Sequence, residues 1–152
     1  VSLGGNLLLD IGPKADGTFP KQVHHVLEEA GNWLNHYGAA IYGTRAGLPK
    51  EYCEFPTTTS ANGHTLFVFV PKGVETVYMK GLLPKIKSAF YLDNDARVAY
   101  EIIGKISWSS HPGLISLKTS GNGPTPYARV IAIDLEESIF DNTGKMKLDE
   151  LK

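Results

Sequence analysis

The hydrophobic pattern changes near residue 45 and divides the chain into two parts. In the first part, Asn6–Ile11 is almost continuously apolar and ends at Gly12-Pro13. A run without alternation is typical of a strand buried on both faces, as in a parallel sheet or a barrel. From Pro20 onward the spacing predicts one amphipathic helix that starts at this proline and has a left-handed stop at Gly38. Apolar residues recur every three or four positions and are expected to be buried: Val23, Val26, Leu27, Ala30, Trp33, Leu34 and Tyr37.

One strand and one helix cannot enclose a core by themselves. We therefore interpret residues 1–44 as the last unit of something larger, and we expect them to fold stably only with the rest of it. Without that remainder, the apolar strand and the apolar stripe of the helix would lack a partner surface.

The second part, residues 45–135, alternates short apolar segments with turns. Ala61-Asn62-Gly63 predicts a hairpin turn, because Asn-Gly tolerates positive φ at both positions. Segments rich in β-branched and aromatic side chains predict strands at 51–58, 66–70, 76–79, 88–92, 98–103, 106–108, 114–117 and 127–135. This arrangement predicts an antiparallel sandwich or a small barrel. The charged tail, residues 136–152, is expected to be a loose terminus or a short added helix.

Composition excludes several classes of function. The 152 residues suffice for one ordinary domain, or for one small domain and part of another. Fifteen basic against sixteen acidic side chains give a net charge of −1, so the basic excess of a nucleic-acid binder is missing. No apolar run approaches the roughly 20 residues of a membrane span. The single cysteine, Cys53, excludes an internal disulfide, no ligand spacing suggests a metal, and no motif implies a cofactor.

Two carboxylates are candidates for chemistry in the first part. Asp10 and Asp16 flank the Gly12-Pro13 turn, at the carboxyl end of the predicted buried strand. In α/β folds this end of a strand faces the ligand site, where carboxylates serve acid/base or sugar-hydroxyl roles. The structural alternative is that Asp16-Gly17 forms a turn in which Asp16 caps backbone amides.

Aromatic side chains are the candidates in the second part. Trp108, Tyr127, Tyr91 and Tyr100 could form a platform on which a sugar stacks. Packing in the core or across strands is the alternative, and it is the more common role of aromatic residues in strands.

The first 44 residues also resemble a known family. Val1–Pro13 reads VSLGGNLLLDIGP, and Asp16-Gly17, Pro20, Trp33-Leu34 and the segment AIYGT at 40–44 follow in order. This pattern resembles the α-L-fucosidases of glycoside hydrolase family 29, at the end of their catalytic (β/α)8-like barrel. Residues 106–108 and 127–130 resemble late strands of the β-sandwich that follows the barrel in that family. Two positions depart from the pattern: Asp10 stands where the family usually has Asn, and Phe19 where it usually has Ile.

The resemblance implies a fold and an activity. The fold would be the terminal strand–helix unit of a (β/α)8-like barrel (1–44), an antiparallel β-sandwich (45–135) and a charged tail (136–152). The family hydrolyses terminal α-L-fucosyl linkages of glycans with retention and without metal, using an Asp nucleophile and a Glu acid/base from earlier barrel strands. None of these maps onto this chain, so it is expected to hold no catalytic residue and to be inactive alone. Asp10 and Asp16 remain rim candidates for substrate binding.

The expected partners follow from the same resemblance. They are fucosylated glycans, bound through the complete enzyme, and the remaining barrel portion, on the same or a companion chain. A lysosomal or extracytoplasmic, secreted location is expected. The alternative hypothesis is a non-catalytic β-sandwich module that binds carbohydrate or a protein partner.

Overall fold

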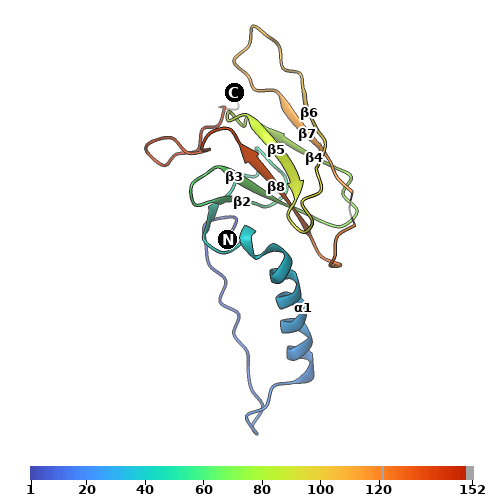
Figure 1. Cartoon of the computed structure of the whole chain (residues 1–152). Helices are drawn as coiled ribbons and strands as arrows, with labels where there is room; N and C mark the ends of the chain where they lie inside the picture. Colours follow the sequence, from blue (N-terminus) through green and yellow to red (C-terminus); the bar gives the residue numbers. More distant parts are fainter. Residues whose placement is uncertain (121, 150–152) are drawn as a thin grey trace.

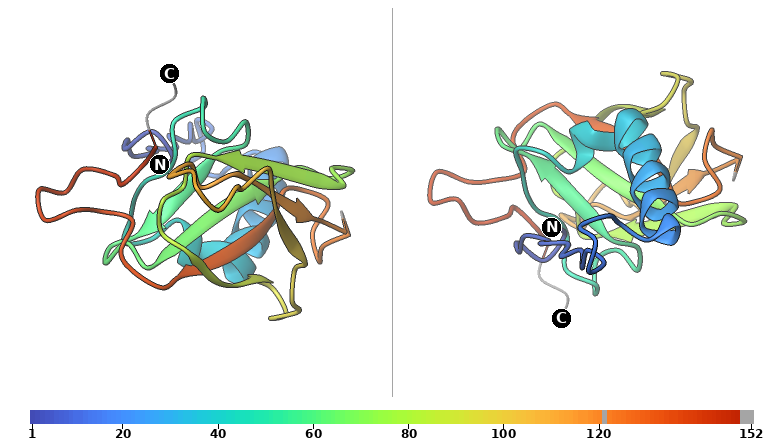
Figure 2. Two further views of the ribbon diagram at one scale, coloured as in Figure 1. Left: turned by 90° about the horizontal axis from the view of Figure 1, so that it is seen from above. Right: turned by 90° about the horizontal axis from the view of Figure 1, so that it is seen from below.

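The computed structural model of the chain describes residues 1–120 and 122–149. An N-terminal segment without regular structure leads to one α-helix, a short 3-10 helix and two antiparallel sheets (Figures 1 and 2). The elements in chain order are α1 (Lys21–Tyr37), η1 (Gly38–Ala40), β1 (Thr44–Ala46), β2 (Thr57–Ser60), β3 (Thr65–Val70), β4 (Thr76–Lys80), β5 (Ile86–Tyr91), β6 (Tyr100–Ile103), β7 (Leu114–Lys118) and β8 (Arg129–Leu135). The helix and the antiparallel sandwich predicted from the sequence are confirmed.

Strand β8 is an interior strand of the larger sheet, and this position explains why its sequence is apolar. The five-stranded sheet has the order β1-β2-β3-β8-β5, and the three-stranded sheet has the order β4-β7-β6. One face of β8 contacts the smaller sheet and the other contacts the end of α1, so nearly every residue of RVIAIDL is buried. A strand covered on both faces has no need of polar alternation.

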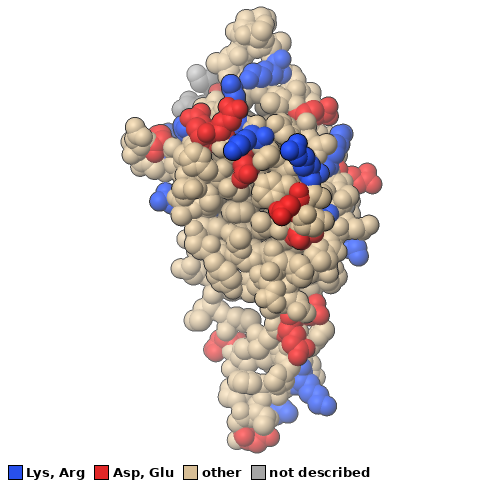
Figure 3. Space-filling view, in the orientation of Figure 1, with Lys and Arg blue, Asp and Glu red and all other residues tan. Residues whose placement is uncertain are grey.

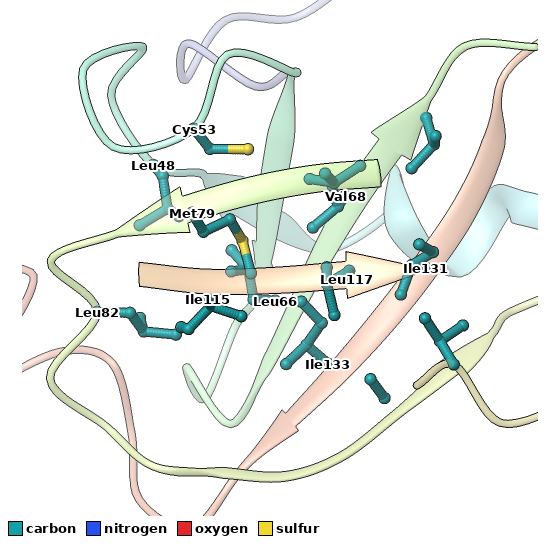
Figure 4. Close-up of a cluster of buried hydrophobic side chains, with 14 of the residues drawn as sticks. Leu48, Cys53, Leu66, Val68, Met79, Leu82, Ile115, Leu117, Ile131 and Ile133 are labelled. Carbon is teal, nitrogen blue, oxygen red and sulfur yellow. The ribbon is translucent and has the colours of Figure 1, made fainter. Parts of the chain in front are cut away.

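The main core lies between the two sheets (Figure 4). Leu66, Ile131 and Ile133 of the larger sheet pack against Met79 and Leu117 of the smaller one, and all five are fully buried. A second cluster lies on the outer face of the larger sheet and joins it to the end of α1; its buried members are Tyr37, Ala40, Phe67, Val130 and Ala132.

The tail is anchored to the sandwich and contains no helix in its described part. Ile139 is fully buried, and isolated bridges join Phe140 to Met146 and Leu82 to Leu148. Residues 150–152 lie outside the described residues. The β2–β3 hairpin packs closely against this tail: a Cβ at Gly63 would come within 2.4 Å of Ser138 Oγ.

The predicted strand over Asn6–Ile11 is not formed, and this is the main correction. These residues carry no strand assignment, and Leu7 and Leu8 are 83% and 91% exposed. A buried parallel strand exists only when neighbouring strands supply its hydrogen bonds and cover both faces. The described chain supplies neither, so the apolar run is extended but unpaired.

Smaller differences have local causes. Residues 106–108 form a turn, closed by a hydrogen bond from Ser109 N to Ile106 O, and 51–56 precede β2 as turn and coil. Gly38 has φ −57° and continues into η1 instead of making a left-handed stop. At the hairpin the positive φ falls on Gly63 and not on Asn62. Strand β1, at the edge of its sheet, was not predicted.

Candidate functional site

The N-terminal segment and α1 form an arm that projects from the sandwich (Figure 1). Only the start of the segment is held: Gly47 N donates a hydrogen bond to Ser2 O, and Gly4 N donates to Val1 O. The segment then runs away from the sandwich beside α1 and returns through Pro20 into the helix. Its apolar side chains therefore face solvent.

A groove of about 1450 Å³ lies between this arm and the sandwich. The N-terminal segment, one face of α1, residues 41–46 and the segment before β8 all contribute to it. Its lining is mainly apolar, with polar groups from His25, Glu29 and Tyr127. Val26 and Tyr42, which also line it, are 57% and 67% exposed. Such a large exposed apolar surface marks a place where another chain segment binds.

On one face of the molecule, charged side chains are scarce over the middle. On the face shown in Figure 3 they gather over the upper part of the sandwich and along the far end of the arm, while the belt between carries few. Tyr127 lines the groove together with residues of α1, and partial burial and the neighbouring Glu29 carboxylate raise its pKa.

The two candidate carboxylates lie in the arm and are not brought together by any described contact. Asp10 Oδ1 accepts a hydrogen bond from the next residue's backbone N–H at 2.9 Å. Asp16 Oδ1 accepts from both the hydroxyl of Thr18, at 2.7 Å, and its backbone N–H, at 3.0 Å. These bonds favour the ionised form and lower the pKa of Asp16. This geometry is a turn capped by the Asp16 side chain, which was predicted from the sequence as the structural alternative to a role in ligand binding.

A buried polar cluster joins α1 to the sandwich, and sequence reasoning missed it. We call it the junction cluster: Tyr37, Tyr91, Asp93, Ser120 and Arg129. Arg129 Nε and Nη2 donate to the two Asp93 carboxylate oxygens at 2.8 and 2.9 Å, and both side chains are less than 10% exposed. The guanidinium carbon lies 3.4 Å from the centre of the Tyr91 ring. Tyr37, the last residue of α1, places its hydroxyl 3.4 Å from Asp93 Oδ1.

The electrostatics of the junction cluster follow from this packing. Burial opposes ionisation of Asp93, but the hydrogen bonds and charge of Arg129 outweigh it and hold the pKa of Asp93 below its usual value. Burial, followed by the Asp93 charge, raises the pKa of Tyr37 to about 12. Close by, Trp33 Nε1 donates to Ala128 O at 2.8 Å. Two consecutive turns of α1 are thus bonded to the sandwich.

A signal for this cluster was present in the sequence. Arg129 is the one cation inside an apolar strand, and a charge in such a place requires a buried partner. The choice of Asp93 over Asp95, two positions further along the chain, could not be predicted, because it depends on how β5 ends beside β8.

The four aromatic residues considered as a sugar platform do not share one surface. Tyr91 is buried beneath Arg129, and Tyr127 lines the groove beside α1. Trp108, 84% exposed, lies in the β6–β7 loop at the end of the sandwich remote from the arm (Figure 1). Tyr100 Oη instead donates to Ile86 O. The platform hypothesis therefore finds no support in their positions.

Within residues 1–120 and 122–149, no group of three His, Cys, Asp or Glu side chains could hold a metal ion. In the same residues, no helix has the length and apolar character needed to cross a membrane.

Comparison with known proteins gives one consistent result. A family model described as "Alpha-L-fucosidase" matches residues 1–39. The chain is 40% identical over 72 residues to the α-L-fucosidase of Dictyostelium discoideum, covering 45% of this chain and 16% of that protein. It is 31% identical over 116 residues to the tissue α-L-fucosidase of Mus musculus, covering 74% and 24%. With the plasma α-L-fucosidase of Rattus norvegicus, identity is 50% over 44 residues, covering 29% and 10%.

Solved structures agree with these relatives. The α-L-fucosidase isoenzyme 1 of Paenibacillus thiaminolyticus superposes with a TM-score of 0.69 at 27% identity, over 90% of this chain and 32% of that one. A Bacteroides thetaiotaomicron α-L-fucosidase of family 29 superposes with a TM-score of 0.72 over 89% of this chain and 30% of that one; at 17% identity it supports the fold alone.

The chain belongs to the α-L-fucosidase family, glycoside hydrolase family 29, and corresponds to part of the full-length enzymes. It spans less than a third of the length of each of these relatives.

Proposed function

We propose that this chain is the C-terminal part of a retaining α-L-fucosidase, in which residues 1–44 close the catalytic barrel and the sandwich braces it. The observation that carries the proposal is the unpartnered arm. The family model matches residues 1–39, and apolar residues of this segment, among them Leu7, Leu8 and Val26, are left exposed by the described chain. Burying them against the remaining barrel strands would turn the extended run Asn6–Ile11 into the buried strand that its sequence predicts.

The proposed substrates are glycans with terminal α-L-fucosyl groups. In this proposal, nucleophile and acid/base come from the remaining barrel portion, on the same or a companion chain, because a retaining glycosidase needs two carboxyl groups about 5 Å apart across the bond. No described contact holds Asp10 and Asp16 in that way.

Asp10 and the loop to Asp16 are proposed to lie at the rim of the active site. In the complete enzyme, Asp10→Asn introduces the residue that the family usually has, so kcat/KM should stay within about threefold. Asp10→Ala removes the polar group and should raise KM with little change in kcat, as expected for lost ground-state binding. Equal kinetics for both variants would place Asp10 outside the site.

The activity itself is tested with 4-nitrophenyl α-L-fucoside. The 152-residue chain alone should give no turnover. The endogenous polypeptide that carries this sequence should hydrolyse the substrate and release α-L-fucose as the first product, before the sugar equilibrates with its β-anomer. Absence of turnover by the endogenous polypeptide and by its complexes would refute the proposal. A location in a lysosomal or extracytoplasmic, secreted compartment is proposed with it, supported by the plasma and tissue names of two relatives.

A further inference from the structure

Strand β6 is an open edge of the three-stranded sheet. The other sheet edges each receive a backbone contact from a neighbouring segment: the Cys53–Met79 bridge on β4, the Phe90–Arg97 bridge on β5, and the hydrogen bond from Gly47 to Ser2 beside β1. Within residues 1–120 and 122–149, no strand or bridge pairs with the outer side of β6. The edge lies remote from the arm and from the groove (Figure 1).

The backbone of β6 offers hydrogen-bonding groups on this open side. Lys118 N donates to Ala99 O at 2.9 Å, which sets the alternation of the ladder between β6 and β7. Glu101 and Ile103 therefore exchange hydrogen bonds with β7, and the N–H and C=O groups of Tyr100 and Ile102 point outward.

The side chains of β6 lack the usual protection of an edge. Natural edge strands carry lysines, prolines or bulges that prevent pairing. Here Ile102 and Ile103 are 46% and 44% exposed. The one charge, Glu101, lies 3.9 Å from Lys118 Nζ of its own chain.

The exposed Ile102 lies on the core face of its sheet. The registers align Ile102 with Ile115 and Ile115 with Met79, which are both buried between the sheets. Ile102 is exposed only because it lies at the open margin of the sandwich. A further strand beside β6 would continue the core over it.

We propose that β6 pairs antiparallel with β6 of a second copy of this chain, with Ile102 on the two-fold axis. An antiparallel edge is complementary to itself, as an isologous interface requires. Charge selects the register: centring the axis on Glu101 would oppose two glutamates, which destabilises a pair, whereas centring it on Ile102 sets Glu101 against Ile103. The two Ile102 side chains then bury each other. This inference does not depend on the fucosidase assignment.

A cysteine at the axis tests the geometry. Residues facing each other in a hydrogen-bonded antiparallel pair have Cα atoms about 5.5 Å apart, within the range that a disulfide spans. Ile102→Cys should therefore give a covalent dimer on mild oxidation. Lys72→Cys is the matched control on an exposed turn, and the native Cys53 is buried. Equal cross-linking of the two variants, or none with Ile102→Cys, would overturn the proposal.

Sedimentation equilibrium of the complete protein that carries this chain tests the association itself. Ile102→Lys should raise the dimer dissociation constant at least tenfold, because it places two ammonium groups across the axis. Leu83→Lys makes a similar change at a 45% exposed leucine outside the groove and should leave the constant unchanged. A protein that is monomeric at all concentrations, or one whose association falls with Leu83→Lys and not with Ile102→Lys, would contradict the proposal. Circular dichroism confirms that each variant is folded.

Discussion

The junction cluster makes the stability of the chain depend strongly on one carboxylate. Asp93→Asn preserves the shape of the side chain but removes its charge, and it leaves the Arg129 guanidinium buried without a described counter-ion. Removing one partner of a buried ion pair costs about 3–5 kcal/mol, since the remaining charge is not solvated. Domains of ordinary size have a free energy of unfolding of about 5–15 kcal/mol. The substitution should therefore remove a large fraction of the stability.

Urea unfolding provides the measurement, followed by far-UV circular dichroism and by tryptophan fluorescence, in which half-buried Trp33 beside the cluster reports the change because Trp108 is already exposed. Asp95→Asn is the matched control. Asp95 is exposed and has a φ of 56°, a conformation that Asn tolerates well, so its free energy of unfolding should change by less than about 0.5 kcal/mol. Equal unfolding free energies for the two variants would refute the argument.

A double substitution separates the pair from its surroundings. Asp93→Leu with Arg129→Met removes both charges and retains much of the volume, and apolar replacement of a buried ion pair is often neutral or stabilising. The double variant should therefore be more stable than Asp93→Asn by at least about 1 kcal/mol. A double variant as unstable as the single one would show that the cost does not come from the isolated Arg129 charge.

Four further predictions concern the pH dependence that Asp93 causes and three other parts of the chain. The pKa of Asp93 is lowered, so its contribution to the free energy of unfolding is complete above the ordinary Asp pKa near 3.9. This contribution is lost as the pH falls through the lowered pKa. Acid titration should show the loss in the native chain and not in Asp93→Asn. Thr58→Val removes the hydroxyl that donates to a carbonyl of η1 at 2.6 Å and should cost about 1–2 kcal/mol in urea unfolding. Gly73→Ala should lower the free energy of unfolding by roughly 1–2 kcal/mol, and Gly63→Ala should lower it at least twice as much. Both glycines have positive φ, but only Gly63 is closely packed. Equal losses of melting temperature in the two variants would contradict this. Burial raises the pKa of Cys53 to about 11, so at pH 8 its thiol should react with Ellman's reagent only as fast as the chain unfolds.

The sequence allowed prediction of elements whose cause is local. Helix α1 has a proline before its first turn and an apolar stripe at helical spacing, and both features act within a few residues. Strands β3, β7 and β8 are apolar and β-branched between turn residues, which is a local pattern as well. The hairpin at Gly63 belongs to the same class.

The parts that could not be predicted depend on distant neighbours. Asn6–Ile11 has the composition of a buried strand, but strand formation requires partners that the described chain does not contain. Residues 106–108 have strand-like composition and lie in an exposed loop where no strand faces them. The pairing of Asp93 with Arg129 joins the ends of β5 and β8, which lie 36 positions apart in sequence.

Site prediction had the same limits. The capped turn at Asp16 depends on Thr18, two residues away, and was foreseen as an alternative. The groove depends on the arm, the sandwich and the segment before β8 together, so no local pattern could indicate its shape. The family resemblance rested on a motif within residues 1–44, and the family model matches residues 1–39 of that segment.

The intact mass of the endogenous polypeptide that carries this sequence tests the central claim most directly. The chain corresponds to about a third of the solved relatives, so the account predicts a mass near three times 16.6 kDa, or a stable complex with a companion chain that supplies the remaining barrel. A polypeptide of 16.6 kDa that occurs alone, with no companion chain, would contradict the account, because the arm would then have no barrel to complete.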